Sequence, residues 1–462
     1  MKVAFCASEV APFAKTGGLA DVAGALPLAL EKLEHEVIII MPGYKSVHQA
    51  KFEIKKLNKH ISYANIGKAI KVYFIESDKY FHRSNLYCDK HGDYKDNLER
   101  FAYYCKESLN LLKEINFPAD IIHIHDWQAS LIPVYLKAFF SQDNFYKNIK
   151  TVLTIHNLGY QGIFPREEFP KLGLDWPYFG MDGLEFFGKI NLLKAGLIFS
   201  DIINTVSPTY SREIQSEELG FGLEGILSGR KDSLYGILNG LDYNYWSPET
   251  DKYILKNYSL KSIEDKLANK LELQKICGFK QDTNIPVFGI VSRLAEQKGF
   301  DILAEDFESI CKLGAHFIVL GIGEHRYHVL LEKMTQEYPQ SISVHLEFNE
   351  ALAHKVYAGS DVFLMPSQYE PCGLGQMIAL RYGALPLVFK TGGLADTVNS
   401  QNGFIFDDYN KEDLLGTVKK ATEVFQDKKK WFGLVKNAMQ CDFSWDVSAK
   451  KYIELYEKAK SK

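Results

Sequence analysis

Short runs of apolar residues recur along the whole chain, and each ends at a glycine, a proline or a polar cluster. They cover residues 37–41, 72–75, 121–124, 152–155, 202–206, 287–291, 317–320, 362–365 and 385–389. Between them lie segments with helical spacing of apolar positions, such as 97–112 and 352–359. A strand that is apolar at every position is buried on both faces, which is typical of a parallel sheet covered by helices. The pattern therefore predicts an α/β fold built from right-handed β-α-β units.

One segment occurs twice in the chain. Lys15–Asp21 (KTGGLAD) recurs as Lys390–Asp396, 375 residues later (390 − 15), and each copy lies between a predicted strand and a predicted helix. So large a separation excludes a repeat array and indicates two similar α/β domains, each with a glycine-rich turn. We expect the first domain to comprise residues 1–237 and a C-terminal helix in residues 445–462, and the second to comprise residues 238–444.

Composition fits a folded protein of two or three domains. The 462 residues are 46% hydrophobic and 24% charged, as in ordinary globular proteins. A net charge of −4 argues against binding to nucleic acid or to an anionic membrane. The seven cysteines are scattered without a Cys-x-x-Cys pair, which argues against a zinc site and favours a reducing compartment. Because no apolar run is long and Glu9 interrupts the first one, we expect a cytoplasmic protein without a signal peptide or a membrane span.

The first glycine-rich turn has the features of a ligand-binding loop. Gly17 and Gly18 precede a predicted helix and let the backbone approach a ligand, and N–H groups at a helix N-terminus attract an anion. Lys15 adds a positive charge for a phosphate, or a donor for a sugar hydroxyl. The segment matches neither the dinucleotide pattern G-x-G-x-x-G nor a Walker loop. The alternative is a plain tight turn.

Two further polar loops directly follow predicted strands of the second half. Residues 292–299 contain Arg293 and Lys298, and an arginine with a nearby lysine is typical of a diphosphate clamp. Residues 366–375 contain Glu370 between prolines and glycines that restrict the backbone, so its carboxylate is placed to bind sugar hydroxyls. Open α/β sheets bind ligands at the carboxyl ends of their strands, where both loops lie. The alternative in each case is a solvated surface loop.

Histidines gather at two predicted strands of the first half. His123 and His125 alternate along the strand 121–125, so both face the same side of the sheet. No third ligand has suitable spacing, which favours core or edge histidines over a metal site. His156 follows the strand 152–155 beside a glycine-containing loop, as an active-site group would, although polar loops often carry a histidine without a function.

Taken together, these motifs resemble the glycogen and starch synthases of the bacterial type, over nearly the whole chain. The matching segments are Lys15–Asp21, His125–Trp127, Thr154–Gly162, Asn204–Tyr210, Gly236–Gly240, Arg293–Gly299, Glu370–Leu374 and Thr391–Leu394. The resemblance implies two Rossmann-like domains facing across a cleft, the GT-B arrangement. It also implies transfer of glucose from ADP-glucose or UDP-glucose to the non-reducing 4-hydroxyl of an α-1,4-glucan such as glycogen. The anomeric configuration would be retained, and neither a metal nor another cofactor would be needed.

The resemblance also implies the residues of the site. The catalytic group would be Asp126, His156, Arg293, Lys298 and Glu370, with Arg293 and Lys298 on the diphosphate and Glu370 on the glucose. The substrate-binding residues would be Lys15, Gly17, Gly18, Asp21, Tyr160, Asn239, Gln297, Phe348, Cys372, Gly373, Leu374, Gly375 and Thr391, with Phe348 at the position of an aromatic ring that stacks on adenine. The sequence departs from the family at Gln128, where many members have histidine, and at Gly375, where many have threonine. Ile378 stands where related transferases often have a second glutamate.

The same residues bear on mechanism and on the alternatives. Arg293 and Lys298 can stabilise the charge of a leaving diphosphate without a metal. No carboxylate pair with glycosidase-like spacing is recognisable, so we favour attack from the face that the phosphate leaves, with the phosphate accepting the proton.

A nucleotide-sugar epimerase would need no acceptor, and a non-catalytic glucan-binding relative would lack Lys15, Arg293, Lys298 or Glu370, all of which are present. A pyridoxal-phosphate phosphorylase would need a buried lysine, whereas both lysines of the repeated segment lie in predicted exposed turns.

Overall fold

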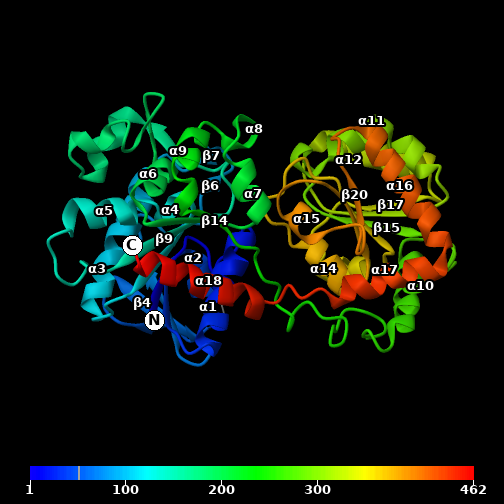
Figure 1. The fold of residues 1–462 in the computed structure, drawn as a ribbon, viewed down its shortest axis with the longest axis horizontal. Coiled ribbons are helices and arrows are strands. Elements are labelled where there is room, and N and C mark those ends of the chain that lie inside the picture. Colours follow the sequence, from blue (N-terminus) through cyan, green and yellow to red (C-terminus); the bar gives the residue numbers. More distant parts are fainter. Residues whose placement is uncertain (50–51) are drawn as a thin grey trace. The chain divides into compact units, whose positions relative to one another are not determined.

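The computed structural model describes residues 1–49 and 52–462 of the chain. These residues form two compact units, Met1–Gly240 with Trp445–Lys462, and Leu241–Ser444 (Figure 1). Each unit has one large sheet with helices packed against it and its own hydrophobic core. The predicted α/β class is confirmed in both units.

The first unit is built on a nine-stranded sheet in the order β14-β13-β9-β8-β1-β2-β5-β4-β3. Its strands are β1 (Lys2–Cys6), β2 (Glu36–Pro42), β3 (Lys55–Lys56), β4 (Ile61–Ile66), β5 (Ile70–Ile75), β8 (Ile121–His125), β9 (Lys150–Ile155), β13 (Ile202–Thr205) and β14 (Leu234–Gly236). From β14 to β5 all neighbours pair in parallel, whereas β4 and β3 pair antiparallel. The expectation of a purely parallel sheet is wrong at this edge, because the short connection between β4 and β5 can only form a hairpin.

Helices cover this sheet in layers. They are α1 (Gly18–Lys32), α2 (Lys45–Gln49), α3 (Asn97–Glu114), α4 (Asp126–Ala129), α5 (Leu131–Phe139), α6 (Leu192–Phe199), α7 (Pro208–Glu213), α8 (Glu217–Gly220), α9 (Glu224–Gly229) and α18 (Trp445–Lys460). In Figure 1 the C-terminal α18 (red) lies beside α1 (blue), and it also contacts β8 and β9. The last helix of the chain therefore packs against the sheet of the first unit.

The described part of the first unit also contains two small antiparallel sheets. One consists of β10 (Ile163–Pro165), β12 (Lys189–Asn191) and β11 (Glu185–Phe186), and the other of β6 (Cys88–Asp89) and β7 (Gly92–Asp93). Both are inserted in the chain between strands of the large sheet.

The second unit has a six-stranded parallel sheet in the order β17-β16-β15-β18-β19-β20. Its strands are β15 (Val287–Val291), β16 (His316–Leu320), β17 (Ile342–His345), β18 (Val362–Met365), β19 (Leu385–Phe389) and β20 (Phe404–Phe406). Its helices are α10 (Lys266–Ile276), α11 (Phe300–Cys311), α12 (His325–Glu337), α13 (Glu350–Gly359), α14 (Gly375–Arg381), α15 (Gly392–Thr397), α16 (Lys411–Gln426) and α17 (Lys428–Gln440). Three of the apolar runs predicted as strands coincide with β15, β18 and β19 at both ends.

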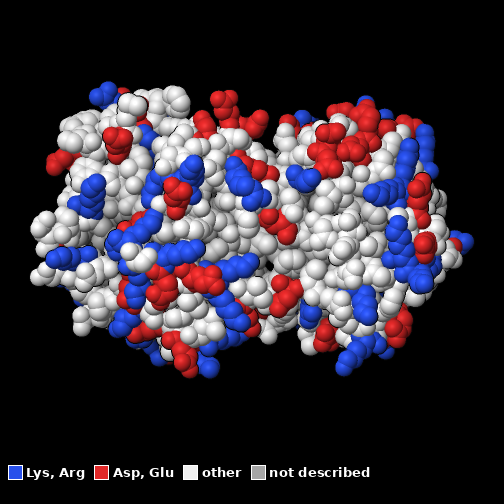
Figure 2. Space-filling view, in the orientation of Figure 1, with Lys and Arg blue, Asp and Glu red and all other residues white. Residues whose placement is uncertain are grey.

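The surface agrees with the modest net charge. Figure 2 shows lysine and arginine side chains interspersed with aspartate and glutamate side chains on the face in view. Among the described residues, no helix is both long and apolar enough to cross a membrane.

Candidate active site

Asp126 and His156 directly follow two neighbouring strands of the first sheet, at the carboxyl ends of those strands. β8 and β9 pair in parallel with His125 opposite Thr154, so Asp126 and His156 emerge close together. The Asp126 carboxylate accepts a hydrogen bond from the backbone N–H of His156 at 2.7 Å. Asp126 has a φ of 54°, in the left-handed region that costs energy for a residue with a side chain. Such strain is concentrated at functional sites, so this strand end is a candidate for the chemistry.

Burial moves the pKa values of these two side chains in opposite directions. Burial raises the pKa of Asp126 to about 7, although the backbone N–H groups of His156 and Asn157 oppose the rise. Burial lowers the pKa of His156 to about 3, so its imidazole is neutral at physiological pH. The strand end thus presents a neutral imidazole next to a carboxyl group that is partly ionised near neutrality.

Behind His156 lies a row of buried imidazoles. Nδ1 of His125 is 3.0 Å from Nε2 of His156, and the rings of His123 and His125 are 4.2 Å apart on the same face of the sheet. His123 and His125 are both fully buried. The prediction that they are core histidines is confirmed. Within residues 1–49 and 52–462 there is no cluster of three side chains suited to a metal ion.

The first glycine-rich turn is exposed from Lys15 to Gly18, and on its inner side it forms hydrogen bonds with a buried carboxylate. Glu9, only 4% exposed, accepts hydrogen bonds from the backbone N–H of Thr16, from the Thr16 hydroxyl at 2.6 Å and from the N–H of Gly17 at 3.3 Å. The anion expected at these N–H groups is therefore supplied by the chain itself. Lys15 forms an ion pair with Asp21 at 2.7 Å on the surface.

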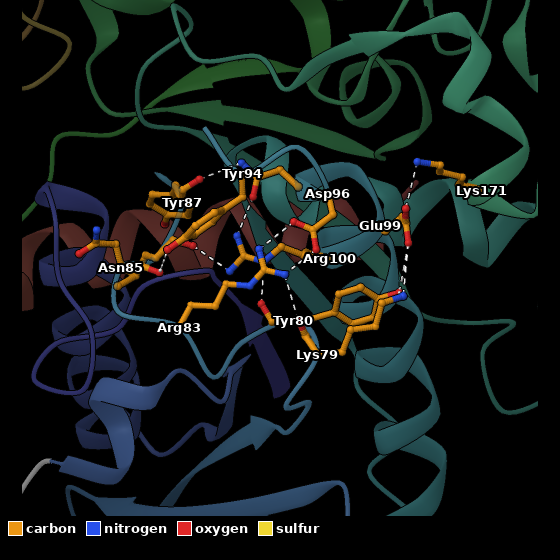
Figure 3. A network of polar contacts seen from close by, with 12 residues as sticks. Lys79, Tyr80, Arg83, Asn85, Tyr87, Tyr94, Asp96, Glu99, Arg100 and Lys171 are labelled. Carbon is orange, nitrogen blue, oxygen red and sulfur yellow. Dashed lines mark hydrogen bonds and ion pairs between the residues drawn. The ribbon is translucent and has the colours of Figure 1, made fainter. Parts of the chain in front are cut away.

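A second support reaches Glu9 from the segment that contains the β6–β7 hairpin. The Tyr87 hydroxyl donates to Glu9 at 2.7 Å. The neighbouring backbone is fixed by the fully buried Arg100, whose guanidinium donates to the carbonyl of Tyr80 at 2.7 Å (Figure 3). The same guanidinium donates to the carbonyl of Leu86 at 2.9 Å. These contacts tie the glycine-rich turn to the core of the first unit.

In the second unit the polar loops after β15 and β18 meet. Nζ of Lys298 lies 2.6 Å from Oε2 of Glu370, and the two side chains are only 22% and 10% exposed. Gly299 has a φ of 81°, and a Cβ atom there would lie 2.1 Å from the carbonyl oxygen of Pro366. Only glycine permits this approach of the two loops, which brings Lys298 to Glu370. The more exposed Arg293 donates to the side-chain oxygen of Gln297 at 3.3 Å.

The second copy of the repeated segment lies beneath the Glu370 loop. Gly392 and Gly393 are buried, and the N–H of Gly393 donates to the carbonyl of Glu370 at 3.1 Å. A Cβ atom at Gly393 would lie 2.0 Å from the carbonyl oxygen of Cys372. This copy therefore supports the backbone around Glu370, whereas the first copy is open to solvent.

The predicted site residues fall into two groups, one in each unit. The first unit contains Lys15, Gly17, Gly18, Asp21, Asp126, His156, Tyr160 and Asn239, and the second contains Arg293, Gln297, Lys298, Phe348, Glu370, Cys372, Gly373, Leu374, Gly375 and Thr391. Within each unit the charged members cluster at the carboxyl edge of the sheet. The aromatic rings of Tyr160 and Phe348 are 60% and 89% exposed, as free stacking surfaces would be. Asn239 is buried, and among the described residues its Oδ1 has no hydrogen-bond partner.

Comparison with known proteins decides the family. Residues 2–229 match the model described as starch synthase catalytic domain, and residues 264–460 match glycosyl transferases group 1. A glycogen synthase from Geotalea uraniireducens (strain Rf4) is 48% identical, with 99% of each chain covered, and one from Thermosipho melanesiensis is 46% identical, with 100% of each chain covered. The chain belongs to the glycogen synthase family. It is therefore a glucosyltransferase.

A solved structure supports the same assignment for the fold. The catalytic domain of starch synthase IV from Arabidopsis thaliana, bound to ADP and acarbose, has a TM-score of 0.89 at 32% identity and covers 100% of this chain and 99% of its own. The predicted GT-B class is confirmed for this member of the glycogen synthase family.

Sequence reasoning did not assign two residues that the structure brings to the site. Glu9 served only to argue against a signal peptide, and His125 was interpreted as a core residue. The signal for Glu9 was an acidic side chain within an otherwise apolar stretch close to Lys15. The signal for His125 was its position directly before Asp126 at the end of a buried strand.

Proposed function

We propose that this glucosyltransferase uses ADP-glucose to extend the non-reducing end of an α-1,4-glucan, with retention of the anomeric configuration. The observation that carries the proposal is the largely buried ion pair of Lys298 with Glu370, with Arg293 nearby on the same loop as Lys298. A preformed pair of this kind presents a cation for a diphosphate and an anion for sugar hydroxyls without any rearrangement. Support for adenosine comes from the bound ADP of the starch synthase structure.

On the donor side, Arg293 and Lys298 bind the diphosphate and stabilise the charge that it gains on leaving. Glu370 holds the glucose, and its interaction with Lys298 fixes both side chains in place. Phe348 offers an exposed ring for the adenine. The remaining substrate contacts come from Lys15, Gly17, Gly18, Asp21, Tyr160, Asn239, Gln297, Cys372, Gly373, Leu374, Gly375 and Thr391.

In the reaction the bond from the anomeric carbon to the phosphate oxygen breaks, and a bond to the acceptor 4-oxygen forms on the same face. The proton of the acceptor hydroxyl passes to the departing phosphate oxygen, so no base from the protein is required. The carboxyl group of Asp126, whose pKa is about 7, is ionised in part of the molecules and offsets positive charge at the sugar. No metal takes part in this scheme.

The compartment follows from the thiols. All seven cysteines are free, which suits a reducing environment, and we place the enzyme in the cytoplasm.

The test is transfer of radiolabel. ADP-glucose and UDP-glucose, each labelled in the sugar, are incubated separately with the protein and glycogen, and label is measured in precipitated polymer before and after α-amylase digestion. The proposal requires amylase-sensitive label from ADP-glucose. Label only from UDP-glucose would correct the donor, and no label from either would refute the function.

The repeated segment supplies a matched pair of variants for this assay. Lys15→Ala should lower incorporation strongly, because Lys15 is proposed to bind the donor. Lys390→Ala removes the same residue from the same sequence, and Lys390 forms only a surface ion pair with Asp407 at 2.8 Å. Its incorporation should equal that of the wild type. Equal effects of the two substitutions would remove Lys15 from the proposed site.

A further inference from the structure

His125 belongs to the row of buried imidazoles next to His156, and its contact with His156 bears on how His156 is protonated. We propose that His125 is a positioning residue, which donates its Nδ1–H to Nε2 of His156 and so holds the His156 proton on Nδ1. The inference deepens the proposed function and rests on it, since it concerns how a proposed catalytic residue is set for the reaction.

A single proton lies between the two rings. Burial lowers the pKa of His156 to about 3 and holds that of His125 well below its ordinary value, so both imidazoles are neutral. A distance of 3.0 Å between Nδ1 of His125 and Nε2 of His156 is that of a hydrogen bond. With both rings neutral, either His125 donates and His156 carries its proton on Nδ1, or His156 donates and His125 carries its proton on Nε2.

The surroundings of Nε2 of His125, the ring nitrogen that does not contact His156, distinguish these two arrangements. Its Nε2 is buried, and among the described residues it has no hydrogen-bond partner. If His156 donated, this atom would be a buried N–H without an acceptor, and orphaned donors of that kind are rare in folded proteins. If His125 donates, the same atom is only an unused acceptor, which is less exceptional.

Among the described residues, the neighbours of His125 offer no acceptor for a proton on its Nε2. Both nitrogens of His123 are already engaged, with the Tyr456 hydroxyl at 2.8 Å and the Thr154 hydroxyl at 2.7 Å. The ring of Phe5 stacks on that of His125 at 5.6 Å and offers no acceptor in its plane. Donation from His125 to His156 is therefore the arrangement that the surroundings favour.

The consequence concerns what His156 can do. The residue His156 is partly exposed. Among the described residues its Nδ1 has no hydrogen-bond partner, and it is not one of the buried atoms that lack a partner. This nitrogen is therefore open to solvent. With its proton there and its lone pair engaged by His125, His156 can donate a hydrogen bond to a sugar or phosphate oxygen but cannot act as a general base. This agrees with a reaction in which the departing phosphate takes the acceptor proton.

The test reads the tautomer directly. The full-length protein is labelled with 15N at its 13 histidines, the signals of His156 are assigned by their loss in His156→Gln, and two-bond correlations show which nitrogen carries the proton. The expected result for the wild type is a proton on Nδ1 of His156. A proton on Nε2 would overturn the proposal, and this measurement needs no substrate. A protein that transferred no glucose would refute the proposed function while leaving the tautomer readable.

Variants of His125 connect the tautomer to the reaction. His125→Asn keeps an N–H donor in the place of Nδ1, whereas His125→Leu removes it. We expect His125→Leu to release the His156 tautomer and to lower kcat by about tenfold or more, with a smaller change in KM for ADP-glucose. His125→Asn should retain the Nδ1 proton and most of the activity. A fixed tautomer in His125→Leu, or a released tautomer with unchanged kcat, would contradict the positioning role.

Discussion

Acidification should destabilise the first unit through His123, His125 and His156, and Asp126 should offset part of the loss. Burial lowers the pKa of His123 and of His156 to about 3 and that of His125 well below its ordinary range, so all three stay neutral while the unit is folded. An unfolded histidine has a pKa of about 6.5 and takes up a proton as the pH falls. The unfolded state then binds more protons, so stability decreases below about pH 6.5.

The size of the effect follows from these values. At about pH 5, protonation of one unfolded histidine stabilises the unfolded chain by about 2 kcal/mol relative to about pH 7.5, so His123 and His156 together contribute about 4 kcal/mol, and His125 acts in the same direction. Asp126 acts in the opposite direction, because its folded pKa of about 7 lies above its ordinary value of 3.8. Between about pH 7 and pH 3.8 the carboxyl group of Asp126 therefore carries a proton in the folded state and not in the unfolded state. This proton stabilises the folded state by about 2.5 kcal/mol at about pH 5 relative to about pH 7.5. The expected net loss is about 1.5 kcal/mol from His123, His156 and Asp126, and it is larger by the contribution of His125; even the smaller figure is a noticeable part of the stability of a typical domain.

Hydrogen exchange can measure this loss within the first unit alone. Peptides that cover β8 and β9 report the free energy of opening of the sheet core at each pH. Asp126→Asn removes the offset, so its loss should exceed that of the wild type by about 2.5 kcal/mol, whereas His123→Asn should reduce the loss by about 2 kcal/mol. Substitution of the exposed His91 by Asn serves as the control and should change nothing. Equal losses in the wild type and Asp126→Asn would refute the reasoning about Asp126, and a wild type without any loss would refute that about the histidines.

Three further outcomes are expected. Arg293→Ala and Lys298→Ala should each cost about 2–5 kcal/mol of transition-state stabilisation in kcat/KM. The exposed Arg293 should be removed with a Tm near that of the wild type, and a loss of folding in that variant would show a structural role instead, whereas Lys298→Ala should also lower the Tm, because it leaves the Glu370 carboxylate largely buried without its partner. Gly393→Ala should lower the Tm by several degrees, because its Cβ would lie 2.0 Å from the Cys372 carbonyl oxygen, whereas Gly18→Ala has nothing within 4 Å and should leave the Tm unchanged. Similar Tm values for the two variants would contradict this account. Activity should survive millimolar EDTA, and inhibition that a divalent ion reverses would overturn the metal-free scheme.

The sequence predicts those elements that are specified locally. The runs at β15, β18 and β19 are apolar throughout and are followed by Ser292, Pro366 and Lys390, so their burial and their limits could be read directly. β4 was missed because exposed and buried positions mix along it, as is usual for a strand near a sheet edge. The polar loops were predicted for the same reason as the central strands, since a parallel sheet brings the ends of its strands to one edge.

Contacts between distant segments were beyond prediction. Glu9 acquires its role from the Tyr87 hydroxyl, 78 positions away, and from the turn at Thr16 and Gly17. The partner of His125 lies 31 positions away on the neighbouring strand. Nothing in the local sequence distinguishes a buried glutamate or histidine that supports a site from one that merely fills the core. The difference lies in which donors and acceptors the fold places around it.

The repeated segment shows the same point within one chain. Gly17 and Gly392 occupy the same place in identical heptapeptides, yet φ is −153° at Gly17 and 43° at Gly392. Glycine has access to both conformations at little cost, so its surroundings determine which one is adopted. In the first copy the Glu9 carboxylate draws the N–H of Gly17 inward and leaves the outer face open, whereas in the second the backbone around Glu370 lies directly on the glycines. The repeat therefore predicts a turn that begins a helix in both places, and only the tertiary contacts determine that one copy is open to solvent and the other supports a loop.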